Sequence, residues 1–296
     1  MEQQVCNACP RNCGARREDE TSLGVCGMPR EFRVSRVALH LWEEPPISGK
    51  NGSGTIFFAG CNLRCVFCQN KEISQGGKGK IMTADQLEAA MLDLRDQGAA
   101  NINLVTPTHY AESLRPLLQR VKPKLGIPIV YNCGGYEKVE TLGALEGLVD
   151  IYLPDFKYAS GEIAKKYSGA PDYPARAEAA LCEMLRQVGP PVFRADGTLE
   201  KGVIVRHLVL PGNRKDTAAV LRLLAERFGV KDYLLSLLWQ YTPEFALDSP
   251  YQELHRRVTT FEYKSAAELA ETLGFEGFFQ SKSSATAAYT PPFDEE

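Results

Sequence analysis

Three cysteines in the first quarter of the chain have the spacing needed to hold an iron–sulfur cluster. In the segment GTIFFAGCNLRCVFCQN, Cys61, Cys65 and Cys68 are separated by three and then two residues and directly follow an apolar run that predicts a buried strand. Three thiolates on one loop can ligate three irons of a [4Fe–4S] cubane and leave the fourth iron open to a small molecule. A structural zinc site is the alternative, but zinc in such sites usually takes four Cys or His ligands. No fourth ligand follows nearby, so the pattern favours the cluster.

The same segment resembles a known family. A C-x3-C-x-aromatic-C pattern after the first strand of an α/β repeat is similar to the signature of the radical S-adenosylmethionine (SAM) superfamily. The longer stretch EEPPISGKNGSGTIFFAGCNLRCVFCQNKEIS resembles the pyruvate formate-lyase-activating-enzyme-like branch. The resemblance implies that SAM chelates the open iron and that one electron breaks its sulfonium–C5′ bond. The 5′-deoxyadenosyl radical then abstracts a hydrogen atom from the substrate, while the protein positions the reactants.

Four further cysteines precede this loop. Cys6, Cys9, Cys13 and Cys26 are separated by two, three and twelve residues in CNACPRNCGARREDETSLGVCG. They can close a tetrahedral zinc site or hold a second iron–sulfur cluster. Zinc would brace a segment too short to form its own core, whereas a cluster could relay electrons or sense oxygen. We expect a structural metal here and leave zinc and iron–sulfur open.

Cysteine usage also indicates the compartment. Seven of the nine cysteines lie within the first 68 residues, and no secretory signal is visible at the N-terminus. We therefore expect a cytoplasmic protein whose clustered thiols are metal ligands rather than disulfides. Cys133 and Cys182 are isolated, and we expect both to be small buried hydrophobes.

The overall composition is that of a soluble globular protein, with 44% hydrophobic and 24% charged residues. A net charge of -3 provides no global attraction to nucleic acid, and no apolar run is long enough to span a bilayer. We expect neither a nucleic acid nor a membrane as partner.

Short β-branched runs alternate with amphipathic helices over most of the chain, which predicts a parallel sheet with right-handed crossovers. The helix expected over 84–97 starts with a capping box between Thr83 and Gln86, and Gly98 follows its end. The predicted strands are 54–59, 101–105, 127–131, 149–153, 202–210 and 233–239. Further helices are predicted at 111–122, 137–147, 173–187, 214–227 and 265–272.

An open doubly wound sheet also satisfies this alternation, but no G-x-G-x-x-G follows an early strand, so a dinucleotide-binding domain has no support. With the resemblance, we predict an α/β fold: a partial (β/α)6 TIM-type barrel with an N-terminal cysteine-rich extension. Its parts are a metal-binding extension in a polar, loop-like context (1–42), a Pro/Gly/Ser-rich linker (43–54), the barrel (55–280) and a flexible tail (281–296).

Polar residues at strand ends are the candidate SAM ligands, because β/α barrels place their working residues there. The superfamily often has Gly-Gly-Glu after the second strand, contacting the SAM amino group. This chain has TPTH instead, so Thr106, Thr108 or backbone carbonyls would have to supply that contact. After the third strand, Asn132 is the best ligand candidate.

The later strands end in charged residues. Asp155 and Lys157 match an Asp-x-Lys that activating enzymes have near SAM, and Arg206 matches an arginine implicated in binding the SAM carboxylate. A charged Arg206 in an apolar strand is costly unless it is paired, so we expect it to face the barrel mouth. Gln240 ends the sixth strand, where formate-lyase activators would have histidine, and this departure puts the substrate in doubt.

These features favour a radical SAM oxidoreductase, an oxygen-sensitive enzyme of anaerobic metabolism. The first hypothesis is an activase that takes a hydrogen atom from a glycine of a glycyl radical enzyme, with electrons from a flavodoxin- or ferredoxin-like donor. The second is radical SAM modification of another peptide, a small molecule or RNA. The third, a non-catalytic redox or metal-binding protein, leaves the open iron and the polar strand ends unexplained.

Overall fold

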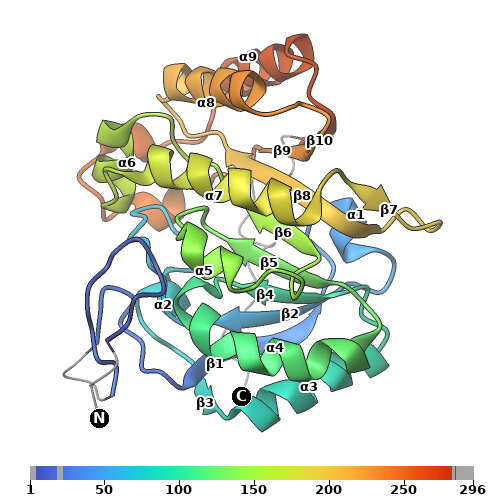
Figure 1. Cartoon of the computed structure of the whole chain (residues 1–296). Helices are drawn as coiled ribbons and strands as arrows, with labels where there is room; N and C mark the ends of the chain where they lie inside the picture. Colours follow the sequence, from blue (N-terminus) through green and yellow to red (C-terminus); the bar gives the residue numbers. More distant parts are fainter. Residues whose placement is uncertain (1–4, 19–22, 282–283, 285–296) are drawn as a thin grey trace.

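Six parallel strands form the centre of the fold. The computed structural model describes residues 5–18, 23–281 and 284. The six strands are those the sequence predicts, and they lie side by side in chain order in a sheet that stays open. They are β2 (Ser53–Phe58), β4 (Ile102–Val105), β5 (Ile129–Cys133), β6 (Ile151–Pro154), β8 (Leu199–Leu208) and β9 (Leu234–Leu238). The predicted partial barrel is therefore confirmed (Figure 1).

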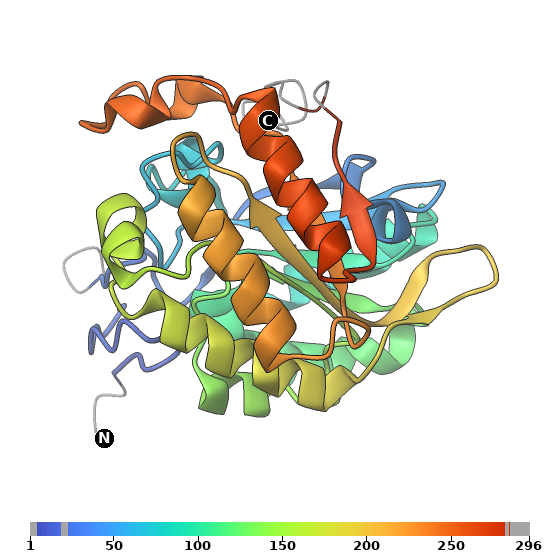
Figure 2. The same ribbon diagram turned by 90° about the horizontal axis from the view of Figure 1, so that it is seen from above.

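Helices cover the outer face of this sheet in the same order as the strands (Figure 1). The predicted helices are α3 (Ala84–Asp96), α4 (Ala111–Leu125), α5 (Val139–Gly143), α7 (Tyr173–Val188), α8 (Arg214–Arg227) and α9 (Thr260–Thr272). The capping box of Thr83 and Gln86 is present on α3, and α9 begins five residues before its predicted start, at a second capping box formed by Thr259 and Glu262. Figure 2 shows α8 and α9 packed side by side.

The sequence analysis missed several shorter elements. They are the helices α1 (Pro45–Ser48), α2 (Lys71–Ser74) and α6 (Gly161–Ser168), the 3-10 helices at Thr108–Tyr110, Pro243–Ala246 and Gln252–Leu254, and the strands β1 (Phe32–His40), β3 (Lys80–Met82), β7 (Val192–Phe193) and β10 (Gly277–Phe279). None of the described helices has the length and apolar character that crossing a bilayer requires.

Strand β1 corrects the prediction that residues 1–42 are loop-like. It pairs antiparallel with β2, so the end of the N-terminal extension belongs to the sheet. Apolar and polar residues alternate over Phe32–Ser35, the first four residues of FRVSRVALH, and only Phe32 and Val34 of the strand are buried. Such alternation is typical of a strand with one buried face. The sequence analysis had grouped this stretch with the polar cysteine-rich segment. The predicted tail 281–296 lies, apart from residues 281 and 284, outside the described residues.

The predicted linker 43–54 is not a simple connector, because α1 lies inside the barrel. Ile47 is fully buried against inward-facing residues of the parallel strands, including Val130, Ile151 and Ile204. Figure 1 shows α1 at the opposite end of the sheet from α2, so α1 fills the end of the barrel where the parallel strands begin.

Replacing Ile47 with alanine tests this assignment. Leaving a cavity in the barrel interior should lower the free energy of unfolding by about 2–5 kcal/mol. Urea unfolding measures the change, with Val192→Ala as the control because Val192 is 48% exposed. An Ile47→Ala protein as stable as the wild type would contradict a role for this segment in the core.

Candidate functional site

The three-cysteine loop lies where the sequence predicts it, directly after β2. Gly60, with a φ of +81°, turns the chain out of the strand. A Cβ on Gly60 would lie 2.2 Å from Met28 Cγ and 2.8 Å from the Cys26 carbonyl oxygen, so only glycine fits this turn. The loop then packs on the neighbouring strand ends, because the Asn62 side chain donates to the Tyr136 carbonyl at 2.6 Å.

Each sulfur of the loop has a polar neighbour. The Leu63 backbone N–H donates to Cys61 Sγ at 3.4 Å, Cys65 Sγ lies 2.9 Å from the Ser168 hydroxyl, and Cys68 Sγ lies 3.3 Å from the Ser74 hydroxyl. Burial raises the pKa of the Cys61 and Cys65 thiols, and the nearby Lys157 ammonium opposes this effect. Negative charge on these sulfurs therefore requires more positive charge nearby than Lys157 supplies. A metal centre bound to the sulfurs would provide it.

The donor set fits a [4Fe–4S] cluster better than a single ion. Among residues 5–18, 23–281 and 284, no three His, Cys, Asp or Glu side chains are arranged to hold one metal ion. A cubane does not require the thiolates to converge on one point, because each of them binds a different iron. Three soft sulfur donors on one loop, with N–H and O–H donors around them, suit such a cluster.

A partly buried network of charges lies at the ends of β5, β6 and β8. Asp155 Oδ2 lies 2.5 Å from Lys157 Nζ, and Asp155 Oδ1 accepts from Arg206 Nε at 2.9 Å. Arg206 Nη2 also donates to Asn132 Oδ1 at 2.6 Å. Four of the predicted site residues are thus brought together, and the charge of Arg206 is paired.

The network adjoins the cysteine loop. A Cβ on Gly134 would contact Leu63 Cδ1 at 2.9 Å and Lys157 Cε at 3.8 Å, so these three residues meet at one place. Burial raises the pKa of Asp155, but the charges of Arg206 and Lys157 lower it overall. Asp155 is therefore a carboxylate at neutral pH, with a cation on either side.

Residues that the sequence analysis missed extend this network into the barrel. Glu43, just before α1, places a carboxylate oxygen 3.8 Å from Arg206 Nη1. Burial, and then the charge of Glu44, raise the pKa of Glu43. Asn103 on β4 is fully buried, and its side chain lies close enough to the Glu43 carboxyl to oppose the rise in the pKa of Glu43. The signal for Asn103 was its position: two residues before the end of a strand, an amide in an apolar run must face inward.

The two threonines after β4 differ in role. Thr106 is half-buried and has a φ of +60°, which is unusual for a β-branched residue and typical of functional sites. Thr108 points elsewhere, because its buried hydroxyl donates to Glu137 Oε1 at 2.7 Å. Its hydroxyl proton is therefore committed to Glu137, and Thr106 is the better of the two candidates.

Gln240 and the two isolated cysteines have different surroundings. Gln240 accepts from the Gln280 side chain at 2.8 Å and thereby ties the end of β9 to the segment after β10. Cys133 is buried as predicted, whereas the prediction for Cys182 is wrong because that thiol is exposed on α7. Cys182 lies on the solvent side of α7. An isolated cysteine in a sequence does not indicate which side of a helix it occupies.

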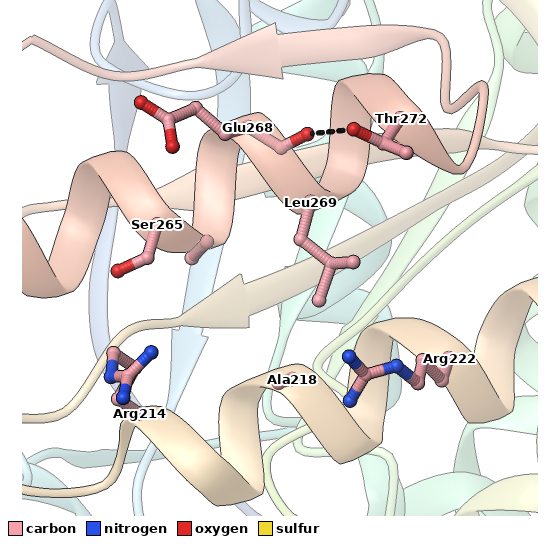
Figure 3. Close-up of a pocket in the computed structure, with 8 residues that line it drawn as sticks. Arg214, Ala218, Arg222, Ser265, Glu268, Leu269 and Thr272 are labelled. Carbon is pink, nitrogen blue, oxygen red and sulfur yellow. Dashed lines mark hydrogen bonds between the residues drawn. The ribbon is translucent and has the colours of Figure 1, made fainter.

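A surface pocket between α8 and α9 does not belong to this site. Figure 3 shows Arg214 and Arg222 of α8 facing Ser265 and Leu269 of α9. Neither the cysteine loop nor the charged network contributes to its lining.

Comparisons with known proteins agree with this geometry. The sequence model of the radical SAM superfamily matches residues 55–224. The chain is 31% identical over 278 residues to the uncharacterized protein MJ0674 of Methanocaldococcus jannaschii, covering 90% of this chain and 74% of that protein. Streptococcus suis SuiB, solved with S-adenosylmethionine bound, has a TM-score of 0.51 at 13% identity, over 75% of this chain and 48% of SuiB. The chain therefore spans about half the length of SuiB.

A solved domain of pyruvate-formate lyase-activating enzyme from Bacteroides vulgatus also matches the chain. Its TM-score is 0.42 at 14% identity, over 58% of this chain and 92% of that domain.

The buried Glu137 makes the stability of the fold depend on pH. Burial raises its pKa from 4.5 to about 7, although hydroxyls of Thr108 and Tyr131 oppose the shift. The folded state therefore holds a proton that the unfolded chain releases near pH 4.5, so the free energy of unfolding should fall as pH rises from about 4.5 to about 7. Glu137→Gln should flatten this slope by up to about 1.4 kcal/mol per pH unit, measured by urea unfolding at several pH values. An unchanged slope would contradict the assignment.

Proposed function

Since the chain belongs to the radical SAM superfamily, we propose that it cleaves SAM at the Cys61–Cys65–Cys68 loop and takes a hydrogen atom from a protein glycine, as an activase of a glycyl radical enzyme. The observation that carries this proposal is the contact between the cysteine loop and the network of Asp155, Lys157 and Arg206. Together they combine a cluster site with an open iron and charges suited to an amino acid moiety.

Cys61, Cys65 and Cys68 would hold the cluster, and the strand-end network would hold SAM. When bound, the cluster supplies the electron that cleaves SAM to methionine and a 5′-deoxyadenosyl radical. Lys157 and Arg206 provide cations for the SAM carboxylate. Asp155 and Asn132 provide oxygens that accept from ribose hydroxyls or from the ammonium group.

The protein also restricts water at this end of the barrel. Phe57 near the end of β2, Val105 at the end of β4 and Ile73 of α2 form a separate apolar cluster there. An apolar lining beside the cysteine loop favours hydrogen-atom transfer to the intended substrate, because it excludes competing reactions with solvent.

The barrel interior supports a peptide substrate. A glycine has no side chain, so an enzyme acting on it must recognise the backbone. The Asn103 amide is buried beside the Glu43 carboxyl, and it offers a donor and an acceptor that can complement a peptide C=O and N–H. We therefore place the substrate backbone beside Asn103. The electron that cleaves SAM would come from a flavodoxin- or ferredoxin-like donor.

Radical modification of another peptide, a small molecule or RNA is the second candidate function. Gln240 favours this second function. It stands where activases of the formate-lyase type are expected to carry histidine, and its side chain is bound to Gln280. The source of the abstracted hydrogen atom separates the two functions.

Cys65→Ala should abolish 5′-deoxyadenosine production from SAM under anaerobic reduction, because the cluster loses one of three protein ligands. The products are quantified by chromatography, and circular dichroism checks that the fold is retained. Cys182→Ser is the matched control, since that cysteine is exposed on α7, and it should retain wild-type turnover. Wild-type turnover by Cys65→Ala would refute the cluster assignment.

Deuterium transfer identifies the substrate atom. A glycyl radical enzyme from the same genome, labelled with Cα-deuterated glycine, should yield deuterated 5′-deoxyadenosine and a glycyl radical signal in electron paramagnetic resonance (EPR). Unlabelled 5′-deoxyadenosine without a glycyl radical would exclude that enzyme as substrate, and deuterium from another labelled residue would favour the second function.

A further inference from the structure

The fold brings together the four N-terminal cysteines, which the proposed function does not use. Cys13 Sγ lies 2.6 Å from the Cβ position of Gly24, two residues before Cys26. The backbone N–H of Cys6 donates to the Ala15 carbonyl at 2.8 Å, which closes the first three cysteines into one loop. Cys9 and Cys26 are both buried. Two chain segments thus converge on one thiol-rich spot.

A buried cation faces this spot. Arg17 is 5% exposed, and among the described residues no carboxylate pairs with it. Its guanidinium donates to the Met28 and Pro29 carbonyls at 2.9 and 2.6 Å, and to the His109 carbonyl, and lies 3.6 Å from Cys6 Sγ. Thiolates at the neighbouring cysteines would give this buried guanidinium anionic partners.

The thiol-rich spot packs directly on the cysteine loop after β2. The Cys26 carbonyl contacts Gly60, the residue before Cys61. Arg64 of the loop donates to the Val25 carbonyl, and Arg11 donates to the Asn62 carbonyl at 2.7 Å. Figure 1 shows the N-terminal segment in dark blue beside α2, which follows the loop. The two groups of cysteines are therefore neighbours.

We propose that Cys6, Cys9, Cys13 and Cys26 hold a second [4Fe–4S] cluster, with Arg17 as its buried counter-charge. Three closely spaced cysteines and a distant fourth resemble the spacing of iron–sulfur ligands more than the paired C-x2–4-C groups of zinc sites. No three side chains of the described residues are arranged around a single ion, which a closed zinc site would require.

The position of this cluster makes it a point at which electrons enter the enzyme, a role that rests on the proposed SAM cleavage. One electron arrives from a low-potential flavodoxin- or ferredoxin-like protein and passes to the neighbouring site across the contact of Cys26 with Gly60. No atom or proton is transferred in this step. The existence of the cluster does not depend on that role.

Metal content tests the site itself. Full-length protein, reconstituted anaerobically with iron and sulfide, should hold about eight irons per chain, Cys9→Ser about four, and the control Cys182→Ser about eight. One zinc with about four irons in the wild type would overturn the proposal.

A second variant tests the same site if Cys9→Ser does not fold. In this variant Cys61, Cys65 and Cys68 are all replaced by alanine, so only the N-terminal cysteines can hold a cluster. It should retain about four irons, and a folded protein without iron would overturn the proposal.

Spectroscopy tests the placement and the counter-charge independently of SAM turnover. In dithionite-reduced wild type, two neighbouring paramagnetic clusters should give an EPR spectrum broadened by their interaction, and Cys9→Ser should give an unbroadened one. Arg17→Gln should lower the reduction potential of the second cluster, whereas Arg30→Gln, a nearby arginine that binds the Arg16 carbonyl, should not. Two non-interacting signals, or equal potentials in both arginine variants, would contradict the proposed arrangement.

Discussion

The charged strand ends of this barrel depend on one partly buried ion pair, between Asp155 and Arg206. The two residues lie on neighbouring parallel strands and are aligned across the sheet, so backbone pairing sets the distance between their side chains. Oxygens of Asp155, Asn132 and Glu43 stabilise the partly buried guanidinium of Arg206. Asp155 in turn holds Lys157 towards the cysteine loop. The ion pair therefore fixes the cations and acceptors that a bound SAM molecule would meet.

The N-terminal extension and the linker after it complete this arrangement from two sides. One part, Glu43 with α1, enters the barrel from the end where the strands begin and supplies both an acid and an apolar plug. The other part, the cysteine-rich segment, rests on the loop after β2 and is held there by arginine side chains that bind backbone carbonyls. Such bonds to carbonyls depend on backbone geometry rather than on the partner's residue type. This explains why the sequence alone gave no sign of these contacts.

Burial also separates candidate residues that look alike in the sequence. Thr106 and Thr108 are two residues apart, yet one takes a strained backbone conformation at the strand end and the other anchors a buried carboxylate. Cys133 and Cys182 are both isolated, yet one is buried in a strand and the other is exposed on a helix. In each pair the local sequence is consistent with either role, and packing decides.

The sequence by itself determined the parallel core, the cysteine loop and the charged strand ends, because each depends on local spacing. Apolar runs and capping residues fix strands and helices, and parallel strands must present their carboxyl ends at one edge. Only the tertiary structure decided that the linker fills the barrel, that Glu43 reaches Arg206 and that the two cysteine groups touch. Those contacts join residues distant in the chain, and no local pattern encodes which distant surface a polar segment will meet.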